Sequence, residues 1–140
     1  MTSTNGKATT LAVQIHLEDA LGDIVRSGSY EAAYFFTEDG LVLAQYDHRN
    51  LLPEQRCTEF ALLMNRLKKA VRSFAGLNQL KEILMEDDYG KRIVFRFIPF
   101  LQQMSVLVAI VPPRRSYRSL TSVFIQRLAK LETFESASGA

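Results

Sequence analysis

The chain has 140 residues, of which 47% are hydrophobic and 23% are charged, and its formal net charge is +2. This length suits one domain with a substantial core, and the composition excludes the disordered and fibrous classes of protein. The longest apolar run, residues 104–113, is shorter than the ~18 residues of a membrane-spanning helix, and the small net charge does not indicate a nucleic-acid partner. We therefore expect neither membrane insertion nor nucleic-acid binding.

The single cysteine, Cys57, cannot form a disulfide within the chain, which fits a reducing, cytoplasmic location. The two ends, residues 1–9 and 134–140, are polar and small, and we expect them to be flexible tails. Between them no linker, repeat or low-complexity stretch interrupts the sequence. The sequence therefore predicts one folded unit over residues 10–133.

The first predicted element is a helix over residues 10–26, because its apolar residues recur at steps of three and four. Gly28 follows it and suits the left-handed position after a helix. Two runs rich in aromatic and β-branched residues come next, at 30–37 and 41–46, with an Asp-Gly pair ending at Gly40 between them. Such a pair between two strand-like runs predicts a β-hairpin.

A second helix is predicted to begin at Pro53 and to end before Gly76, because proline favours the first turn of a helix and glycine the position past its end. Its apolar residues form a seam with heptad-like spacing, which consists of Cys57, Phe60, Met64, Leu67, Val71 and Phe74. Three neighbouring residues widen this seam, namely Ala61, Leu63 and Ala70. The helix therefore carries more apolar surface than one contact face requires, so the seam can face its own sheet, a partner, or both.

Three further strands are predicted over residues 80–87, 92–98 and 103–111, followed by a final helix over residues 116–133. Short connections make neighbouring strands antiparallel. The side chains on both faces of the first and last strands are apolar. In a sheet with one solvent-exposed face, each strand alternates apolar and polar residues. The sequence therefore predicts the order α-β-β-α-β-β-β-α and a three-layer α/β/α sandwich, in which helices cover both faces of a five-stranded, largely antiparallel sheet.

This arrangement resembles the Roadblock-type domain family, which includes the roadblock dynein light chains and bacterial partners of small Ras-like GTPases. The resemblance covers about residues 11–131, and its most telling part is the D-G-L-V-L turn and strand at 39–43 in front of the long helix FALLMNRLKKAVRSFAG. It implies a profilin-like fold and a homodimer in which the second helices pack together and the edge strands after them join two sheets. The interface residues that it implies are Phe60, Met64, Leu67, Val71, Phe74, Leu80, Ile83, Leu84 and Met85.

The resemblance also implies a function without catalytic residues of its own. The dimer would act as a regulator or scaffold that binds a small Ras-like GTPase and modulates its nucleotide cycle by ordering the GTPase's own residues. Two other functions stay open from the sequence. One is a small-molecule sensory domain with a profilin-like or PAS-like sheet, and the other is a structural subunit of a motor or cytoskeletal complex.

Two groups of cations form a possible partner surface, Arg66, Lys68, Lys69 and Arg72 on the second helix, and Arg114, Arg115 and Arg118 at the start of the last. Such cations attract an acidic partner surface, and a helix N-terminus beside arginines can hold an anion. Alternatively, the first group is a solvated face and the second pairs with acidic side chains of the fold or dimer. The acidic side chains in question are Glu54, Glu86, Asp87 and Asp88. The sequence has no phosphate-binding loop, nucleophile elbow or metal-ligand spacing, so we expect no enzyme activity, cofactor or metal.

Overall fold

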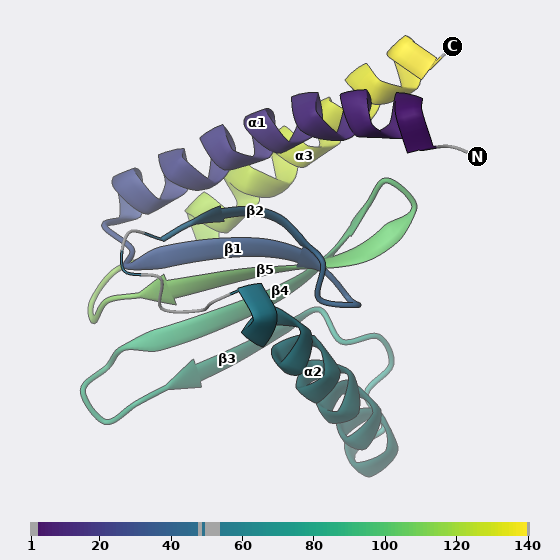
Figure 1. Cartoon of the computed structure of the whole chain (residues 1–140). Coiled ribbons are helices and arrows are strands. Elements are labelled where there is room, and N and C mark those ends of the chain that lie inside the picture. The colour runs from purple at the N-terminus through teal and green to yellow at the C-terminus, as the bar shows by residue number, and fades with distance from the viewer. Residues whose placement is uncertain (1–2, 48, 50–53, 140) are drawn as a thin grey trace.

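The structure, a computed structural model, describes residues 3–47, 49 and 54–139, and its elements follow the predicted order (Figure 1). They are α1 (Ser3–Gly28), β1 (Ala32–Thr37), β2 (Val42–Tyr46), α2 (Glu54–Ala75), β3 (Glu82–Glu86), β4 (Arg92–Phe100), β5 (Gln103–Val111) and α3 (Arg118–Gly139). Pro53, the predicted first residue of the second helix, lies outside the described residues.

The described strands form one five-stranded sheet in the order β2-β1-β5-β4-β3, and every neighbouring pair is antiparallel. β3, β4 and β5 are neighbours in sequence and in space, as the predicted meander requires. β1 pairs with β5 across the whole of its length, from Ala32 with Ile110 to Thr37 with Ser105. β1 and β5 are therefore interior strands, and β2 and β3 are the two edges of the sheet.

Helices cover both faces of the sheet, with α1 and α3 on one side and α2 on the other (Figure 1). All six residues of β1 are buried, because alternate side chains enter opposite cores. On the side of α1 and α3, the ring of Phe35 meets the rings of Phe100 and Phe124 edge to face, with centroids 5.7 and 5.3 Å apart. The predicted three-layer sandwich is confirmed.

The outer helices are longer than predicted, because α1 begins at Ser3 rather than at residue 10 and α3 ends at Gly139 rather than at residue 133. They run side by side in opposite directions, so the two termini lie at the same end of the molecule (Figure 1). Extending an existing helix adds one hydrogen bond per residue without a new nucleus, so polar residues outside the apolar stripe continue it. The folded unit of residues 10–133 and its flexible flanks stay a prediction.

The end of α1 also differs from the prediction, because Ser29, and not Gly28, has the left-handed backbone conformation, with φ of 54°. Gly28 is instead required for space. A Cβ atom at this position would lie 2.3 Å from the ring of Tyr30 and 2.7 Å from the side chain of Leu120. The glycine thus allows α1, β1 and α3 to approach one another closely.

β4 continues to Phe100 rather than ending at Ile98, so Pro99 lies within the strand. Proline lacks the N–H group that a strand donates to its neighbour. Pro99 lies beyond Arg96, the last residue of β4 that pairs with β3, so no pairing with β3 requires its N–H. The predicted turn is thereby displaced to Leu101 and Gln102, both of which have positive φ.

Candidate interaction surface

Exposed apolar side chains gather on α2, in the loop after it and on the edge strand β3. Its members are large apolar side chains that are 42–93% exposed, namely Leu62, Leu63, Phe74, Leu77, Leu84 and Met85. Single exposed apolar residues are ordinary, whereas a group on adjacent elements marks an interaction site. We call this set the α2/β3 surface.

The predicted seam of α2 is divided between two environments. Met64 is 3% exposed and packs in the core between α2 and the sheet. Phe60 and Leu67 are partly buried against the same core, and the ring of Phe60 stacks on Phe95 of β4 with centroids 6.4 Å apart. Phe74, in contrast, is 93% exposed. The inner part of the seam therefore stabilises one chain, and the surface open to a partner is rotated toward Phe74.

Contacts of α2 with the turn between β1 and β2 fix which way the flank that carries Phe74 faces. The side chain of Asn65 donates a hydrogen bond to the carbonyl oxygen of Glu38 at 3.3 Å, and Lys68 Nζ donates to the Glu38 carboxylate at 2.9 Å. Phe74 follows Asn65 by nine residues, which is two and a half turns of helix. Phe74 and Asn65 therefore lie on opposite sides of α2. The flank that carries Phe74 therefore faces away from the β1–β2 turn, toward the edge strand β3.

β3 offers both an unpaired edge and two exposed apolar side chains. Ile83 packs against the core under α2, and Met85 shares its face of the strand because side chains alternate. Leu84 lies on the other face, as does Glu82, whose carboxylate accepts a hydrogen bond at 3.2 Å from Tyr117, the residue before α3. A partner that covers the flank of α2 therefore reaches Met85, whereas Leu84 is reached only from the edge or the far face.

Two residues of the predicted interface, Leu80 and Ile83, are partly buried against the core of their own chain, and Val71 is half-buried. Three exposed residues, Leu62, Leu63 and Leu77, were not in the predicted interface, although Leu63 was predicted to widen the seam. Leu62 lies off the heptad seam and Leu77 lies in the loop past the end of α2, so periodicity gives neither residue a signal. The role of the predicted residues at an interface stays a prediction.

The cations predicted on α2 do not form one group. Lys68 is turned inward, since it pairs with Glu38 and lies 4.4 Å from the centroid of the Phe97 ring. Arg72 donates from Nε to the carbonyl oxygen of Asn78 at 3.2 Å. Arg66 and Lys69 are exposed, and these two remain available for an acidic partner.

The arginines before α3 are exposed and lie in an open hollow beside the β3–β4 turn, which also contains Tyr89 and Arg92. Arg92 donates to the carbonyl oxygen of Arg115, and Arg118 lies over the ring of Tyr117, which raises the pKa of that guanidinium by hydrogen bonding. Among the described side chains, no ion pair joins Arg114, Arg115 or Arg118 to an acidic residue. The side chain of Glu54 lies outside the described residues.

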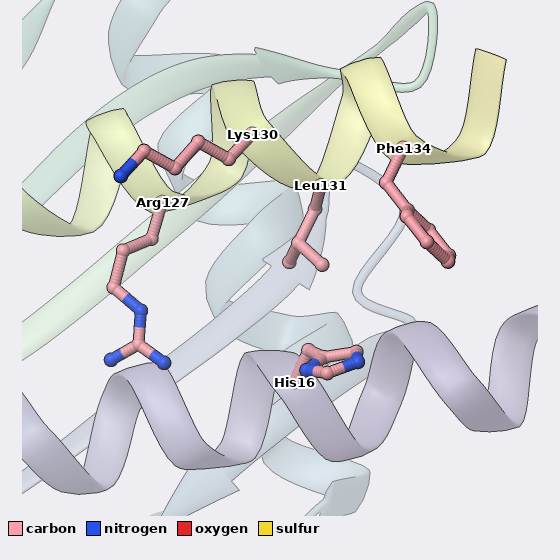
Figure 2. Close-up of a pocket in the computed structure, with 5 residues that line it drawn as sticks. All are labelled: His16, Arg127, Lys130, Leu131 and Phe134. Carbon is pink, nitrogen blue, oxygen red and sulfur yellow. The ribbon is translucent and has the colours of Figure 1, made fainter. Parts of the chain in front are cut away.

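A second hollow with cationic walls lies between α1 and α3 (Figure 2). Its volume is about 280 Å³, and its lining residues are His16, Arg127, Lys130, Leu131 and Phe134. Figure 2 shows that Arg127, Leu131 and Phe134 extend from α3 toward α1. Arg127 forms an ion pair with Asp23, and hydrogen bonds from Arg127 and then from Arg26 lower the pKa of this carboxyl group. The arginine thereby joins the two helices.

Within the described part of the chain, no group of three or more His, Cys, Asp or Glu side chains is placed to hold a metal ion. No described helix combines the length and the apolar character that are needed to cross a membrane. Cys57 is buried in the core between α2 and the sheet.

Several solved structures resemble this chain, although its sequence matches no protein-family model and no curated protein is significantly similar to it. Myxococcus xanthus MglB has a TM-score of 0.71 and 14% identity, and the match covers 88% of this chain and 90% of that one. A structure of MglB with a tetrameric arrangement has a TM-score of 0.69 and 14% identity, with 87% and 91% covered. The Roadblock/LC7 domain from Streptomyces avermitilis has a TM-score of 0.58 and 14% identity, with 86% and 95% covered.

The layers, the order of the elements and the antiparallel sheet together define a profilin-like α/β sandwich. Because these solved structures match it over most of both chains, the protein has, more particularly, a Roadblock-type fold. The resemblance inferred from the order and spacing of the sequence motifs is thus confirmed at the level of the fold.

Proposed function

We propose that two copies of this chain pair through the α2/β3 surface, and that the dimer binds a small Ras-like GTPase and modulates its nucleotide cycle. The observation that carries this proposal is an exposed apolar flank of α2 that faces an unpaired sheet edge, on a Roadblock-type fold. Without a partner, this arrangement leaves apolar side chains in water and strand hydrogen-bonding groups open to non-specific association.

A second copy of the chain is the occupant that fits both features of the surface. Pairing of one β3 edge with the same edge of another copy satisfies the backbone groups of both strands. The same two-fold contact brings the flank of α2 that carries Leu63 and Phe74 against its counterpart, because a symmetric dimer uses the same patch twice. The likeness to an MglB structure with a tetrameric arrangement supports self-association of this fold.

The GTPase part of the proposal rests on the Roadblock-type fold and on the exposed cations of α2. Phosphoryl transfer is accelerated mainly by positioning and by electrostatic stabilisation. Arg66 and Lys69 are exposed, but both are held on a helix that packs against the sheet. A rigid cationic face suits docking and steering of an acidic surface. The dimer therefore acts by ordering the GTPase's own residues.

The direct test is binding of each small Ras-like GTPase encoded in the source genome, purified with GDP and with a non-hydrolysable GTP analogue. We expect one GTPase to bind with a preference for one nucleotide state, and its rate of hydrolysis or exchange to change. The double variant Arg66→Ala/Lys69→Ala should associate more slowly and with a weaker salt dependence, whereas Lys130→Ala on α3 should behave as the wild type. Failure of every GTPase to bind in either state would refute the regulator role and leave the dimer to be judged separately.

A further inference from the structure

An apolar cleft lies on the face of the sheet that α1 and α3 cover, opposite the face covered by α2. It has a volume of about 210 Å³ and is enclosed by three parts of the fold. α1 forms one wall, the start of β2 and the residue before it form another, and the β4–β5 turn closes the end. The cleft is therefore built from segments far apart in the sequence.

The lining of this cleft is uncharged. Val13 and Leu17 of α1 are buried at its base, while Leu41 and Leu101 are 62% and 44% exposed at its mouth. The described residues that line it include no Asp, Glu, Lys, Arg or His. Charged groups are costly to bring into such surroundings without a partner, so the cleft favours neutral and mainly apolar molecules.

One buried polar group lines the cleft, the hydroxyl of Ser105. This residue is 1% exposed, and its Oγ atom has no hydrogen-bond partner among the described residues. Its strand neighbour Thr37 is also buried, yet the Thr37 hydroxyl accepts a hydrogen bond from the backbone N–H of Leu41 at 3.1 Å. Buried hydroxyl groups in folded proteins nearly always have a partner. The Ser105 hydroxyl is thus an unpaired donor and acceptor in the wall of the cleft.

The position of Ser105 in β5 makes this hydroxyl unusual. Leu107, Ala109 and Val111 follow on the same face of the strand, and all three are buried in the core under α1 and α3. A small apolar residue would continue this pattern at position 105 without an unpaired polar atom. The structure therefore gives the serine no role in packing that alanine would not fulfil.

We propose that this cleft binds a small uncharged molecule with an apolar body and one hydroxyl or carbonyl group, which hydrogen-bonds to Ser105 Oγ. The cleft is larger than the 150 Å³ cavity that accommodates benzene in an engineered protein and smaller than the ~300 Å³ at which pockets for drug-sized ligands begin. A single ring or short branched chain with one polar substituent matches this volume. This site is separate from the α2/β3 surface and does not depend on the proposed GTPase partner.

The test uses the full-length protein with ¹³C-labelled leucine and valine methyl groups, titrated with phenol and followed by NMR. Toluene serves as the probe of similar shape without a hydrogen-bonding group, and benzoate as the charged probe. We expect saturable shifts of the Leu17, Leu41 and Leu43 methyl signals, with phenol bound about tenfold more tightly than toluene, as one hydrogen bond provides. Benzoate should cause no saturable shift.

Ser105→Ala should abolish the preference for phenol over toluene and keep the binding of toluene, while Ser122→Ala on the exposed side of α3 should leave both unchanged. Because Ser105→Ala removes a hydroxyl without a partner, it should fold and melt like the wild type, and a melting curve checks this. The proposal is overturned if phenol shifts none of these methyl signals, or if the shifts map to the hollow between α1 and α3. It is also overturned if Ser105→Ala still binds phenol more tightly than toluene.

Discussion

Phe74 gives the sharpest test of the α2/β3 surface, because it is the most exposed large apolar side chain of the described chain. At 93% exposure it contributes almost nothing to the core of a single chain. Phe74→Glu should therefore leave the unfolding of the dilute, monomeric protein unchanged. In a dimer through this surface, the same substitution removes two buried aromatic rings and introduces two carboxylates at the contact.

The size of the effect follows from the area that Phe74 would bury. Full burial of a phenylalanine side chain stabilises a structure by ~1.5–3 kcal/mol. A two-fold interface contains the residue twice, so the loss is ~3–6 kcal/mol per dimer, which corresponds to a ~10²- to ~10⁴-fold weaker Kd. Desolvation of the new carboxylates adds to this loss.

Sedimentation equilibrium over a wide range of concentrations measures this change directly. The wild type should be a dimer, and Phe74→Glu should be a monomer up to much higher concentrations. Phe134→Glu is the matched control, because Phe134 is also exposed but lies on α3 in the opposite layer. An unchanged Kd for Phe74→Glu, or a wild type that is monomeric at all concentrations, would refute the reasoning.

Met64 provides the contrasting case on the same helix. It is 3% exposed and packs against the sheet, so Met64→Ala leaves a cavity and should lower the free energy of unfolding by ~2–5 kcal/mol. The loss should appear in the dilute protein, where no dimer contributes. Equal unfolding of Met64→Ala and the wild type under these conditions would contradict the inward placement of the seam.

Three further predictions concern the fold itself. Gly40→Ala should lower the melting temperature more than Gly76→Ala. Both glycines have positive φ, which costs ~1–2 kcal/mol for alanine, but only at Gly40 would a Cβ atom meet the backbone of α2, at 2.4 Å. Equal losses in the two variants would contradict this reasoning. Burial raises the pKa of Tyr30 to about 12, so the stability that its neutral form contributes is present below pH 10 and is lost as the pH rises toward 12. In an ultraviolet titration, Tyr30→Phe should therefore lack one tyrosine that ionises late in the wild type. Asp23→Asn breaks the ion pairs with Arg127 and Arg26, and because the carboxyl group is exposed this should cost under ~1 kcal/mol at neutral pH. Since the pKa of Asp23 is lowered in the fold, this difference should vanish as the pH falls below the ordinary value of 3.8, which urea unfolding at neutral and low pH measures.

Local sequence signals were sufficient for the order of the elements and for the layers. The Asp-Gly pair at Gly40 located the first hairpin, and the apolar character of both phases of the strands showed that helices cover both faces of the sheet. These features depend on neighbours within a few residues, so they can be predicted from the amino-acid sequence alone. The same signals supported the resemblance that the solved structures confirm at the level of the fold.

The boundaries of the elements were less accessible to sequence reasoning. Gly28 was expected to end α1 through its conformational freedom, but it is needed because Tyr30 and Leu120 approach it. Leu120 is distant from Gly28 in the sequence, so no local sequence pattern predicts this contact. Pro99 similarly fits within β4 only because β3 stops pairing before it is reached.

The sequence by itself determined that α2 has too much apolar surface for one contact, but only the tertiary structure decided how that surface is divided. The seam spacing fits Met64 and Phe74 equally well, yet the sheet covers the first and leaves the second exposed. Likewise, Ser105 looks like any other strand residue until α1, β2 and the β4–β5 turn close around it. Periodicity specifies the angle at which a side chain leaves its own element, whereas burial and the availability of a hydrogen-bond partner depend on distant segments that only the folded chain brings together.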